Sequence, residues 1–568
     1  MSRQHSPARL DWPLTIRSPE ITTRAPFLAL LGLTAASALV LSGCTAASPS
    51  DTASSKPVSG GTLTYASGDA EPTCLDPHVG GNYPQALVST QYLEELVSKN
   101  TAGDVIPWLA TSWKEASDGL SWTFSLKKGV KFTDGTAFDA AAVVANVKHV
   151  QDPTTLSSTG YLALAKVKKA VAVDDSTVRL DLSSPDSSLL DSLSQPWLAI
   201  ESPTALKRTQ AVNCESPVGT GPFKVVKWTK QQSITLERND GYTSPPKDAA
   251  HTGKAYLAKI VWRFLPDSAS RYAALQAGQV DVIDNAQPDT IVAAKKSDQI
   301  KELDAPRPGA SNRLELNSSQ APFNDERVRE AFIRGVAVND GITSLFFGTA
   351  KRSYSLLSSV EKDAYSDPSL FDIDTTKAND LLDSAGWTTR DSAGYRTKDG
   401  KRLTVRFPVS TNQSIPAERA LFEQIQEEAK SLGFDVEISQ LDLSSWYGAL
   451  AAHKYEIVSA PYTKVGPGVL GVLYDSASIT PAPSGYFANN AQVDSRKVDA
   501  LLKQASAESD AAKRADLYEQ VQKSVLEGYY VLPLYDQQNH YLYRTSVHGL
   551  RAMPTVSTPT FYDAWVQR

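Results

Sequence analysis

The sequence predicts an α/β fold, because strand-like and helix-like segments alternate along the chain and one stretch has the pattern of a β-α-β unit. In residues 402–440, an alternating apolar run comes first, and a helix pattern follows with Leu421, Ile425 and Leu432 on one face and Gly433 at its end. A second apolar strand completes the unit, which indicates parallel sheet. Near the C-terminus another long helix pattern runs directly into an apolar strand. No fixed-period repeat is present, which argues against a solenoid or a propeller.

The N-terminal half of the chain contributes further strands and one capped helix. The alternating run 60–67 predicts a first strand. Residues 120–140 predict a hairpin with a Lys-Lys-Gly turn, and an Asp-Gly turn follows. Asp139 stands where it can cap a helix over 140–150. The alternating run 175–184 predicts another strand.

The C-terminal half predicts a helix followed by a strand, two single helices and a hairpin, at 269–284, 324–338, 377–387 and 394–407. Gly278 and Gly386 stand where the first and third of these helices should end, because glycine readily adopts the left-handed conformation of a helix C-terminus. An Asp399-Gly400 pair marks the turn of the hairpin.

The composition is that of an ordinary globular protein, with 41% hydrophobic and 21% charged residues in a chain of 568. This length suits more than one domain. The net charge of -6 is small for the length, which argues against a nucleic-acid partner.

The N-terminus predicts export and lipid anchoring. Basic residues precede a short apolar run that ends in small residues, as in a signal peptide over 1–43. The alternative is a membrane-spanning helix, for which the run is slightly short. The sequence Leu-Ser-Gly before Cys44 resembles the bacterial lipobox, in which the cysteine carries the lipid. The Ser/Thr/Ala/Pro-rich segment 44–60 predicts a flexible tether. We therefore expect a chain outside the cytoplasm, anchored on the outer face of the cell membrane or periplasmic.

Two cysteines remain beyond the lipobox, Cys74 and Cys214. An even pair in an oxidising compartment favours a Cys74–Cys214 disulfide. Two buried free thiols are the alternative.

No catalytic or cofactor motif accompanies these features. The Gly-rich stretch 214–228 raises the possibility of a phosphate-binding loop, but it leads into a β-branched, aromatic strand and not into a helix N-terminus. The seven histidines show no metal-ligand spacing on one helix, and neither a nucleophile elbow nor a Walker motif occurs. We therefore predict no enzymatic activity, no cofactor and no metal. A secreted hydrolase remains as an alternative from another class.

Eight stretches of the chain together carry a family resemblance: 74–78, 93–99, 107–140, 217–228, 274–283, 323–338, 377–387 and 512–535. In this order they resemble the peptide/nickel-type extracellular solute-binding proteins known as family 5. These proteins are the ligand-capturing subunits of ABC importers. The lipobox and tether agree with this resemblance, since a lipid-anchored receptor fits the family.

The resemblance implies a two-lobed, periplasmic-binding-protein-like clamp of type II, cluster C, with an extra subdomain in lobe I. Lobe I is expected over 61–310, with the subdomain near 100–205, and lobe II over 311–529. Residues 530–568 are expected to return to lobe I. The implied partners are a small solute, most readily a peptide or a peptide-like compound, and an ABC permease with its ATPase. A monomer is expected. A surface receptor or chaperone-like binding protein of the same fold, without a permease, is the alternative.

The resemblance also implies where a ligand would bind, although one family feature is missing. Peptide-binding relatives use an acidic residue of lobe II to pair the amino terminus of the peptide. The corresponding segment, 456–470, has no acid after Glu456, and Thr463 or Lys464 falls where the acid is expected. A buried ammonium without a carboxylate is costly, so a free-amine ligand needs an acid from elsewhere. Lys464 instead suits an anionic or carboxylate-bearing ligand, and a solvated loop lysine is the alternative.

Four further residues are implied as ligand contacts by the same resemblance. Trp446 corresponds to a family tryptophan upstream of the anchor segment, and Tyr462 lies within that segment. Asn82 and Tyr83 belong to a loop of lobe I that faces the ligand in relatives.

Overall fold

The computed structural model describes residues 56–568 apart from 460–461 and 463–465, and Pro57–Arg568 form one compact unit. The expected signal peptide, Cys44, Thr463 and Lys464 lie outside the described residues. Among the described residues, no helix is both long and apolar enough to cross a membrane.

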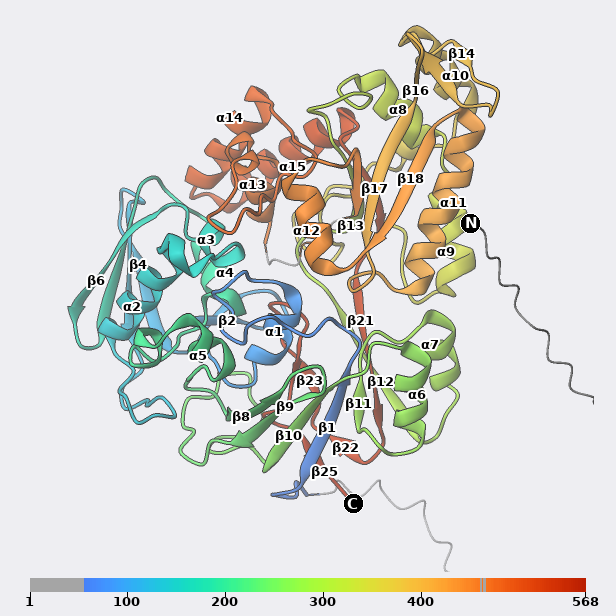
Figure 1. The fold of residues 1–568 in the computed structure, drawn as a ribbon. Helices are drawn as coiled ribbons and strands as arrows, with labels where there is room; N and C mark the ends of the chain where they lie inside the picture. The colour runs from blue at the N-terminus through green and yellow to red at the C-terminus, as the bar shows by residue number, and fades with distance from the viewer. Residues whose placement is uncertain (1–55, 460–461, 463–465) are drawn as a thin grey trace, which may run out of the picture. The chain divides into compact units, whose positions relative to one another are not determined.

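A seven-stranded sheet contains the first strand of the described chain near its centre (Figure 1). Leu63 and Tyr65 of this strand are buried, as the alternating pattern predicts. Strand β1 runs parallel to its neighbours β10 and β11, and the other pairs are antiparallel. In spatial order the strands are β12 (Ile300–Pro306), β21 (Gln538–Arg544), β11 (Val282–Ile283), β1 (Thr62–Ser67), β10 (Lys259–Phe264), β9 (Ser233–Arg238) and β8 (Phe223–Thr229).

A separate four-stranded antiparallel sheet corrects one expectation from the sequence. Its order is β4 (Ala110–Glu115), β5 (Ser121–Leu126), β7 (Thr177–Leu182) and β6 (Val167–Asp174). Strand β5 pairs with β4 on one edge and β7 on the other. Because both edges are occupied, the residues after the Lys-Lys-Gly turn cannot pair back onto β5, and the predicted hairpin is wrong. Only one isolated bridge, Lys131 to Ala137, forms around the Asp134-Gly135 turn.

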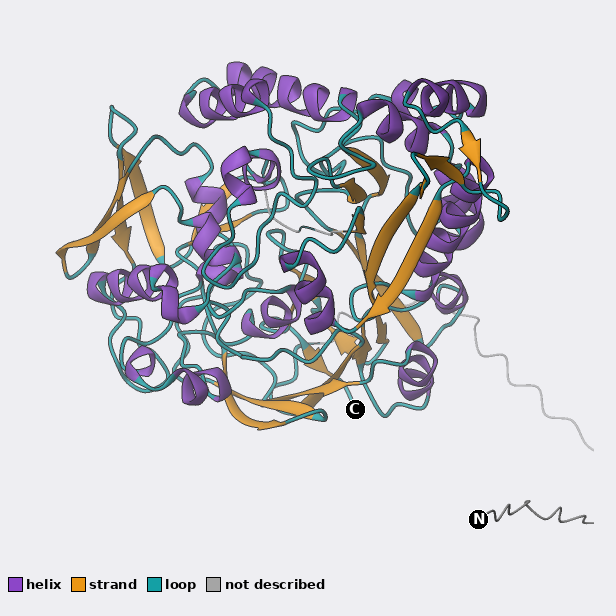
Figure 2. Ribbon diagram, turned by 45° about the horizontal axis from the view of Figure 1, so that its top comes forward, coloured by secondary structure: helices purple, strands orange, loops and turns teal. Residues whose placement is uncertain are grey.

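The β-α-β unit is confirmed. Strands β17 (Thr404–Ser410) and β18 (Asp435–Leu441) are parallel, and helix α11 (Pro416–Leu432) connects them. Its predicted apolar face is buried, and Gly433 ends it with a φ of 102°. Figure 2 shows helices along the outer side of this strand pair.

The chain passes twice between the seven-stranded sheet and a three-stranded sheet of order β19 (Ile457–Ser459), β13 (Asn312–Leu316), β20 (Val531–Tyr535). Strand β12 leads into β13, and β20 leads back into β21. Because β13 and β20 are antiparallel neighbours, the two passages lie side by side. Arg313 and Glu315 form a fully buried ion pair on β13, with a shortest distance of 2.5 Å.

Three hydrophobic cores underlie this arrangement. The buried residues of the largest come from 310–535, those of the second from 96–200, and those of the third from 63–305 together with 541–566. The four-stranded sheet packs in the second core, and the three-stranded sheet and the β17–β18 pair share the first. The seven-stranded sheet packs in the third core and in a smaller cluster that includes Ala66 and Leu542.

The remaining elements agree with most of the predicted boundaries. Asp139 caps α2, accepting a hydrogen bond from the backbone N–H of Ala142 at 2.8 Å. The expected hairpin turn at Asp399-Gly400 joins β15 to β16. The other helices are α1 (Tyr83–Ser89), α2 (Ala140–Gln151), α3 (Thr159–Ala163), α4 (Leu189–Leu193), α5 (Gln210–Glu215), α6 (Ser268–Gln276), α7 (Pro288–Ala294), α8 (Glu326–Arg334), α9 (Val338–Phe346), α10 (Thr375–Ser384), α12 (Leu443–Ala451), α13 (Val469–Tyr474), α14 (Arg496–Ala507) and α15 (Ala511–Glu527). The short strands are β2 (Val97–Lys99), β3 (Val105–Pro107), β14 (Thr389–Arg390), β15 (Arg396–Lys398), β16 (Lys401–Arg402), β22 (Val547–His548), β23 (Arg551–Ala552), β24 (Pro559–Thr560) and β25 (Trp565–Val566).

The Gly-rich stretch serves the architecture and not phosphate binding. Cys214 forms a disulfide with Cys74, and their Cα atoms are 4.4 Å apart. A Cβ atom at Gly219 or Gly221 would lie 2.0 Å or 2.6 Å from the nearest backbone atom of Tyr92. These glycines therefore let the loop pass against the Tyr92 backbone before it enters β8.

Candidate ligand-binding cleft

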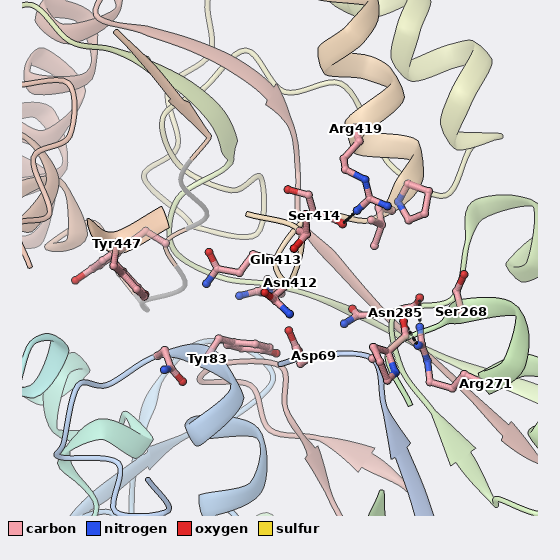
Figure 3. Close-up of a pocket in the computed structure, with 18 of the residues that line it drawn as sticks. Asp69, Tyr83, Ser268, Arg271, Asn285, Asn412, Gln413, Ser414, Arg419 and Tyr447 are labelled. Atoms are coloured by element: carbon pink, nitrogen blue, oxygen red, sulfur yellow. Dashed lines mark hydrogen bonds between the residues drawn. The ribbon is translucent and has the colours of Figure 1, made fainter. Parts of the chain in front are cut away.

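A cavity of about 260 Å³ lies between the carboxyl end of β1 and the loop that joins β17 to α11. Figure 3 shows Asn412 and Gln413 of that loop opposite Asp69 and Tyr83. The lining is polar and aromatic: Gly68, Asp69, Gly81, Asn82, Tyr83, Ser158, Thr159, Trp197, Pro266, Asp267, Ser268, Arg271, Asn285, Gln287, Arg307, Thr411, Asn412, Gln413, Ser414, Ile415, Pro416, Arg419, Tyr447, Tyr462 and Tyr486.

Asn82 and Tyr83 line this cavity, where the sequence analysis expected ligand contacts. The Asn82 side chain caps helix α1 by accepting from the Gln85 backbone N–H at 3.2 Å, and this bond fixes the wall. The Tyr83 hydroxyl accepts from the Asn539 side chain at 2.6 Å. The Arg307 guanidinium stacks on the Tyr83 ring, 3.9 Å from its centre.

The aromatic wall differs from the expectation at one position. Tyr462 lines the cavity, but Trp446 is buried in a small core with Leu450 and donates its indole N–H to the Pro408 carbonyl at 3.2 Å. Adjacent residues of a helix point about 100° apart, and Tyr447 is the one that lines the cavity. It is therefore Tyr447, and not Trp446, that this part of α12 presents to the cavity.

Asp69 is a carboxyl group in the cavity wall that the sequence analysis did not single out. Burial, together with the nearby Asp284 carboxylate, raises the pKa of Asp69 to about 7, although Arg307 acts in the opposite direction. Asp69 therefore changes charge near neutral pH. The sequence around Asp69 did not indicate a binding residue, because the groups that act on this carboxyl, Asp284 and Arg307, come from distant segments.

A buried hydrogen-bond network holds the Asp69 segment in place. Asp284 accepts from the Tyr65 hydroxyl at 2.5 Å and from the Gly68 backbone N–H at 2.6 Å. The guanidinium of Arg271 donates to the carbonyls of Asp284 at 3.0 Å and Asn285 at 2.6 Å. Asp69 lines the cavity beside this network, and its carboxyl group interacts with the Asn285 side chain.

The opposite wall is the polar loop between β17 and α11, which the sequence analysis also missed. Asn412 accepts from the Leu443 backbone N–H at 3.1 Å, which ties the loop to α12. Arg419, on the first turns of α11, lines the cavity and donates to the carbonyl of Ser414. Ligands of α/β proteins commonly bind beyond the carboxyl ends of parallel strands. The polar run after the predicted strand 402–410 was therefore the signal that could have located this wall.

The family model for the bacterial extracellular solute-binding proteins, family 5, middle region, matches residues 104–511. The match covers well over half of the chain. The chain belongs to family 5. Members of this family are solute-binding proteins of ABC transporters and are not enzymes. The prediction of the family is thus confirmed.

Curated relatives of this family 5 protein bind chemically different solutes. The chain is 25% identical to the nickel-binding periplasmic protein of Escherichia coli over 471 residues, which cover 81% of this chain and 86% of that protein. It is 27% identical to the glutathione-binding protein GsiB of Pectobacterium atrosepticum over 463 residues, which cover 80% and 84%.

Solved structures confirm the predicted cluster C fold. DppA of Helicobacter pylori, in complex with the peptide STSA, superposes with a TM-score of 0.78 at 24% identity, covering 90% of this chain and 99% of that chain. NikA of Brucella suis, in complex with Fe(III)-EDTA, superposes with a TM-score of 0.74 at 26% identity, covering 89% and 100%.

Proposed function

We propose that this family 5 protein captures a small peptide-like solute, one that carries both an amine and a carboxylate, and delivers it to an ABC permease. The observation that carries the proposal is that a carboxyl group, Asp69, and a guanidinium, Arg419, line opposite walls of the same cavity (Figure 3). A carboxylate can hold an ammonium, and a guanidinium can hold a carboxylate through two parallel hydrogen bonds. The cavity volume of about 260 Å³ lies just below the about 300–1,000 Å³ that ligand pockets generally measure, which favours a small solute.

Asp69 can replace the ammonium-binding acid that segment 456–470 lacks. Glu456, the one acid in that segment, pairs with Arg406 at 2.9 Å and accepts from its backbone N–H at 2.7 Å. The Glu456 carboxylate is therefore occupied by Arg406 of β17 and is not available to a ligand. Asp69 supplies a carboxylate from the other wall, so a free-amine ligand can still be neutralised.

Capture is proposed to work by closure of two lobes about the paired strands β13 and β20. Lobe I comprises 61–310, with a subdomain near 100–205, together with 530–568, and lobe II comprises 311–529. The division is supported by the separate hydrophobic cores and by the two chain passages, which lie side by side. The exception is β20, whose residues Val531–Tyr535 pack in the core of lobe II. Hinge closure of this kind needs few residues to change conformation.

The anchor at Cys44 and the permease complex complete the proposal. Lipidation would hold the protein at the membrane, where closed, loaded molecules meet the permease. A Cys44→Ala variant should appear in the soluble fraction of cells, and retention of the variant on the membrane would contradict the anchor.

The ligand is tested by native mass spectrometry of the purified chain, followed by calorimetric titration with di- and tripeptides. We expect micromolar or tighter binding of a free peptide. Acetylating its amine should weaken binding by about 10–100-fold, because a hydrogen bond to a charged group contributes about 1.5–3 kcal/mol. Asp69→Asn should remove most of the difference between free and acetylated peptide, and Arg419→Gln should do the same for carboxyl amidation.

Asp267→Asn is the matched control, since Asp267 also lines the cavity but its side chain caps α6 at 2.8 Å, a role that Asn fulfils equally well. Its affinity should stay within about twofold of the unmodified protein. Equal binding of free, acetylated and amidated peptides, or no binding of any of them, would contradict the proposed ligand class.

A further inference from the structure

A group of buried polar side chains lies outside the ligand cavity. Asp76 and His78 follow Cys74, and His149 lies in the last turn of α2. One potential ligand atom from each of these three residues lies within 4.8 Å of the other two. None of the three lines the cavity described above. His78 and Asp76 are almost fully buried, and the His149 side chain is 20% exposed.

The hydrogen bonds of His78 leave one ring nitrogen without a proton. Its Nε2 lies 2.8 Å from the carbonyl of Ala199, which can only accept, so Nε2 carries the hydrogen. The lone pair of Nδ1 therefore lies 3.6 Å from a carboxylate oxygen of Asp76. Nδ1 is buried and has no hydrogen-bond partner among the described residues.

His149 presents a nitrogen to the same carboxylate. The Thr155 hydroxyl donates to the backbone carbonyl of His149 at 2.6 Å, so its oxygen is free to accept from the His149 Nδ1–H at 3.3 Å. This arrangement places the ring hydrogen on Nδ1. His149 Nε2 therefore carries a lone pair and lies 3.1 Å from a carboxylate oxygen of Asp76. Two acceptor atoms at this distance repel each other, and a cation or a second proton between them would relieve the repulsion.

Two further buried atoms near Asp76 also lack partners within the described part of the chain. The Asn213 amide nitrogen donates to Asp76 at 3.0 Å and to Glu201 at 2.8 Å. The Asn213 carbonyl oxygen and Glu201 Oε1 are left without a hydrogen bond. Buried polar atoms in folded proteins nearly always have a hydrogen-bond partner. The unpartnered acceptor atoms of His78, Asn213 and Glu201 therefore indicate that a cation or additional hydrogen-bond donors bind here.

We propose that Asp76, His78 and His149 form a binding site for a divalent transition-metal ion, with Zn²⁺ as the probe that represents this class. Two imidazoles and one carboxylate are ligands that suit Zn²⁺, and three protein ligands leave a fourth position for water. Bonds of about 2.0–2.2 Å require ligand atoms roughly 3–4 Å apart. His149 Nε2 lies 3.1 Å from Asp76 Oδ2 and His78 Nδ1 lies 3.6 Å from Asp76 Oδ1, so each histidine has one oxygen of the carboxylate in that range. One ligand atom from each of the three residues lies within 4.8 Å of the others, so a small approach of the side chains would close the site around an ion.

Each histidine of this site is already held in orientation by a neighbouring oxygen atom. The Ala199 carbonyl orients His78 and the Thr155 hydroxyl orients His149, which are the supporting contacts that metal-bound histidines typically have. A bound ion would join the segment after Cys74 to α2, beside the disulfide that joins the same segment to α5. The sequence showed no metal motif because the ligands come from two distant segments and meet only in the folded chain.

The test is titration of the metal-free full chain with Zn²⁺ in competition with a chelating dye, together with the absorption spectrum of bound Co²⁺. We expect one ion per chain, a higher melting temperature with Zn²⁺, and d–d bands typical of a four-coordinate site. His149→Gln should weaken binding at least tenfold and abolish the shift in melting temperature. This residue is partly exposed, so its substitution should leave folding in EDTA intact.

His251→Gln is the matched control, because His251 also pairs with a carboxylate, Asp563, at 2.8 Å. Its Zn²⁺ affinity should stay within about twofold of the unmodified chain. No Zn²⁺ bound at 10 µM free ion, or unchanged binding in His149→Gln, or equal losses in both variants, would overturn the site. The ligand proposal for the cleft is unaffected by any of these outcomes, since it concerns peptides and Asp69.

Discussion

At the scale of single residues, the site combines positions that sequence comparison could indicate with others that only folding brings together. Asn82, Tyr83 and Tyr462 were expected from the family resemblance, and all three line the cavity. Asp69 and Arg419 were not, since neither lies in a motif. The chemical properties of these side chains depend on neighbours that are distant in sequence. The Asp284 carboxylate, for example, contributes to the raised pKa of Asp69.

The raised pKa of Asp69 predicts a pH-dependent affinity for amine-bearing ligands. Burial holds this pKa at about 7, above the value near 3.9 expected in an unfolded chain. Below pH 7 the group is mostly protonated and must release its proton to hold an ammonium. Affinity should therefore rise by about fivefold from pH 6 to pH 7, reach about tenfold by pH 8 and level off above that.

Calorimetry across this range measures the effect, and the same linkage has a stability counterpart. Because the folded protein binds this proton more tightly than the unfolded chain, the stabilisation from protonated Asp69 is present near pH 4 and is lost as the pH rises through 7. In Asp69→Asn the affinity should be nearly independent of pH. A slope that persists unchanged in this variant would assign the titration to another group.

At the scale of elements, local patterns predicted well wherever a helix packs on one apolar face. The unit over 402–440 is an example, because Leu421, Ile425 and Leu432 recur with helical spacing and all become buried. The prediction of a hairpin after β5 was wrong for a physical reason. An alternating pattern indicates that a segment forms a strand, but it does not show which edges of that strand are already paired. Here β4 and β7 occupy both edges of β5.

The loop before β8 predicts a sharp intolerance to side chains. A Cβ atom at Gly219 would meet the Tyr92 backbone oxygen at 2.0 Å, so Gly219→Ala must displace either the loop or the backbone of Tyr92. We expect a loss of roughly 1–3 kcal/mol in unfolding free energy, the cost of overpacking. Chemical denaturation followed by tryptophan fluorescence measures it.

Gly448→Ala provides the comparison, because Gly448 lies in α12 and a Cβ atom there would meet nothing within 4 Å. Alanine is favoured over glycine in a helix by about 1 kcal/mol, so this variant should be as stable as the original or more so. Equal stability of the two alanine variants would show that the Tyr92 contact is unimportant.

At the scale of the whole molecule, the sequence was sufficient for the family and insufficient for the ligand. Short segments spread from residue 74 to residue 535 point to one fold because their order is specific. The cavity is different, since its walls come from residues within the distant segments 68–83, 266–307 and 411–419, together with single residues of other segments. Relatives at about 25% identity bind nickel or glutathione, so the chemistry of these loops, and not the fold, selects the solute.

The Cys74–Cys214 disulfide predicts how strongly distant parts of the chain depend on one covalent link. It joins residues separated by 140 positions, and cross-links that close long loops remove much entropy from the unfolded chain. The double variant Cys74→Ser/Cys214→Ser should lose about 2–5 kcal/mol of unfolding free energy. Non-reducing peptide mapping should recover the two cysteines in one linked fragment, and reduction of the original protein should reproduce the stability of the double variant. Two free thiols in the mapped protein would contradict the link. A double variant as stable as the oxidised protein would show instead that the backbone hydrogen bond from Leu75 to Cys214, at 2.8 Å, and the packing around it hold this region without the bridge.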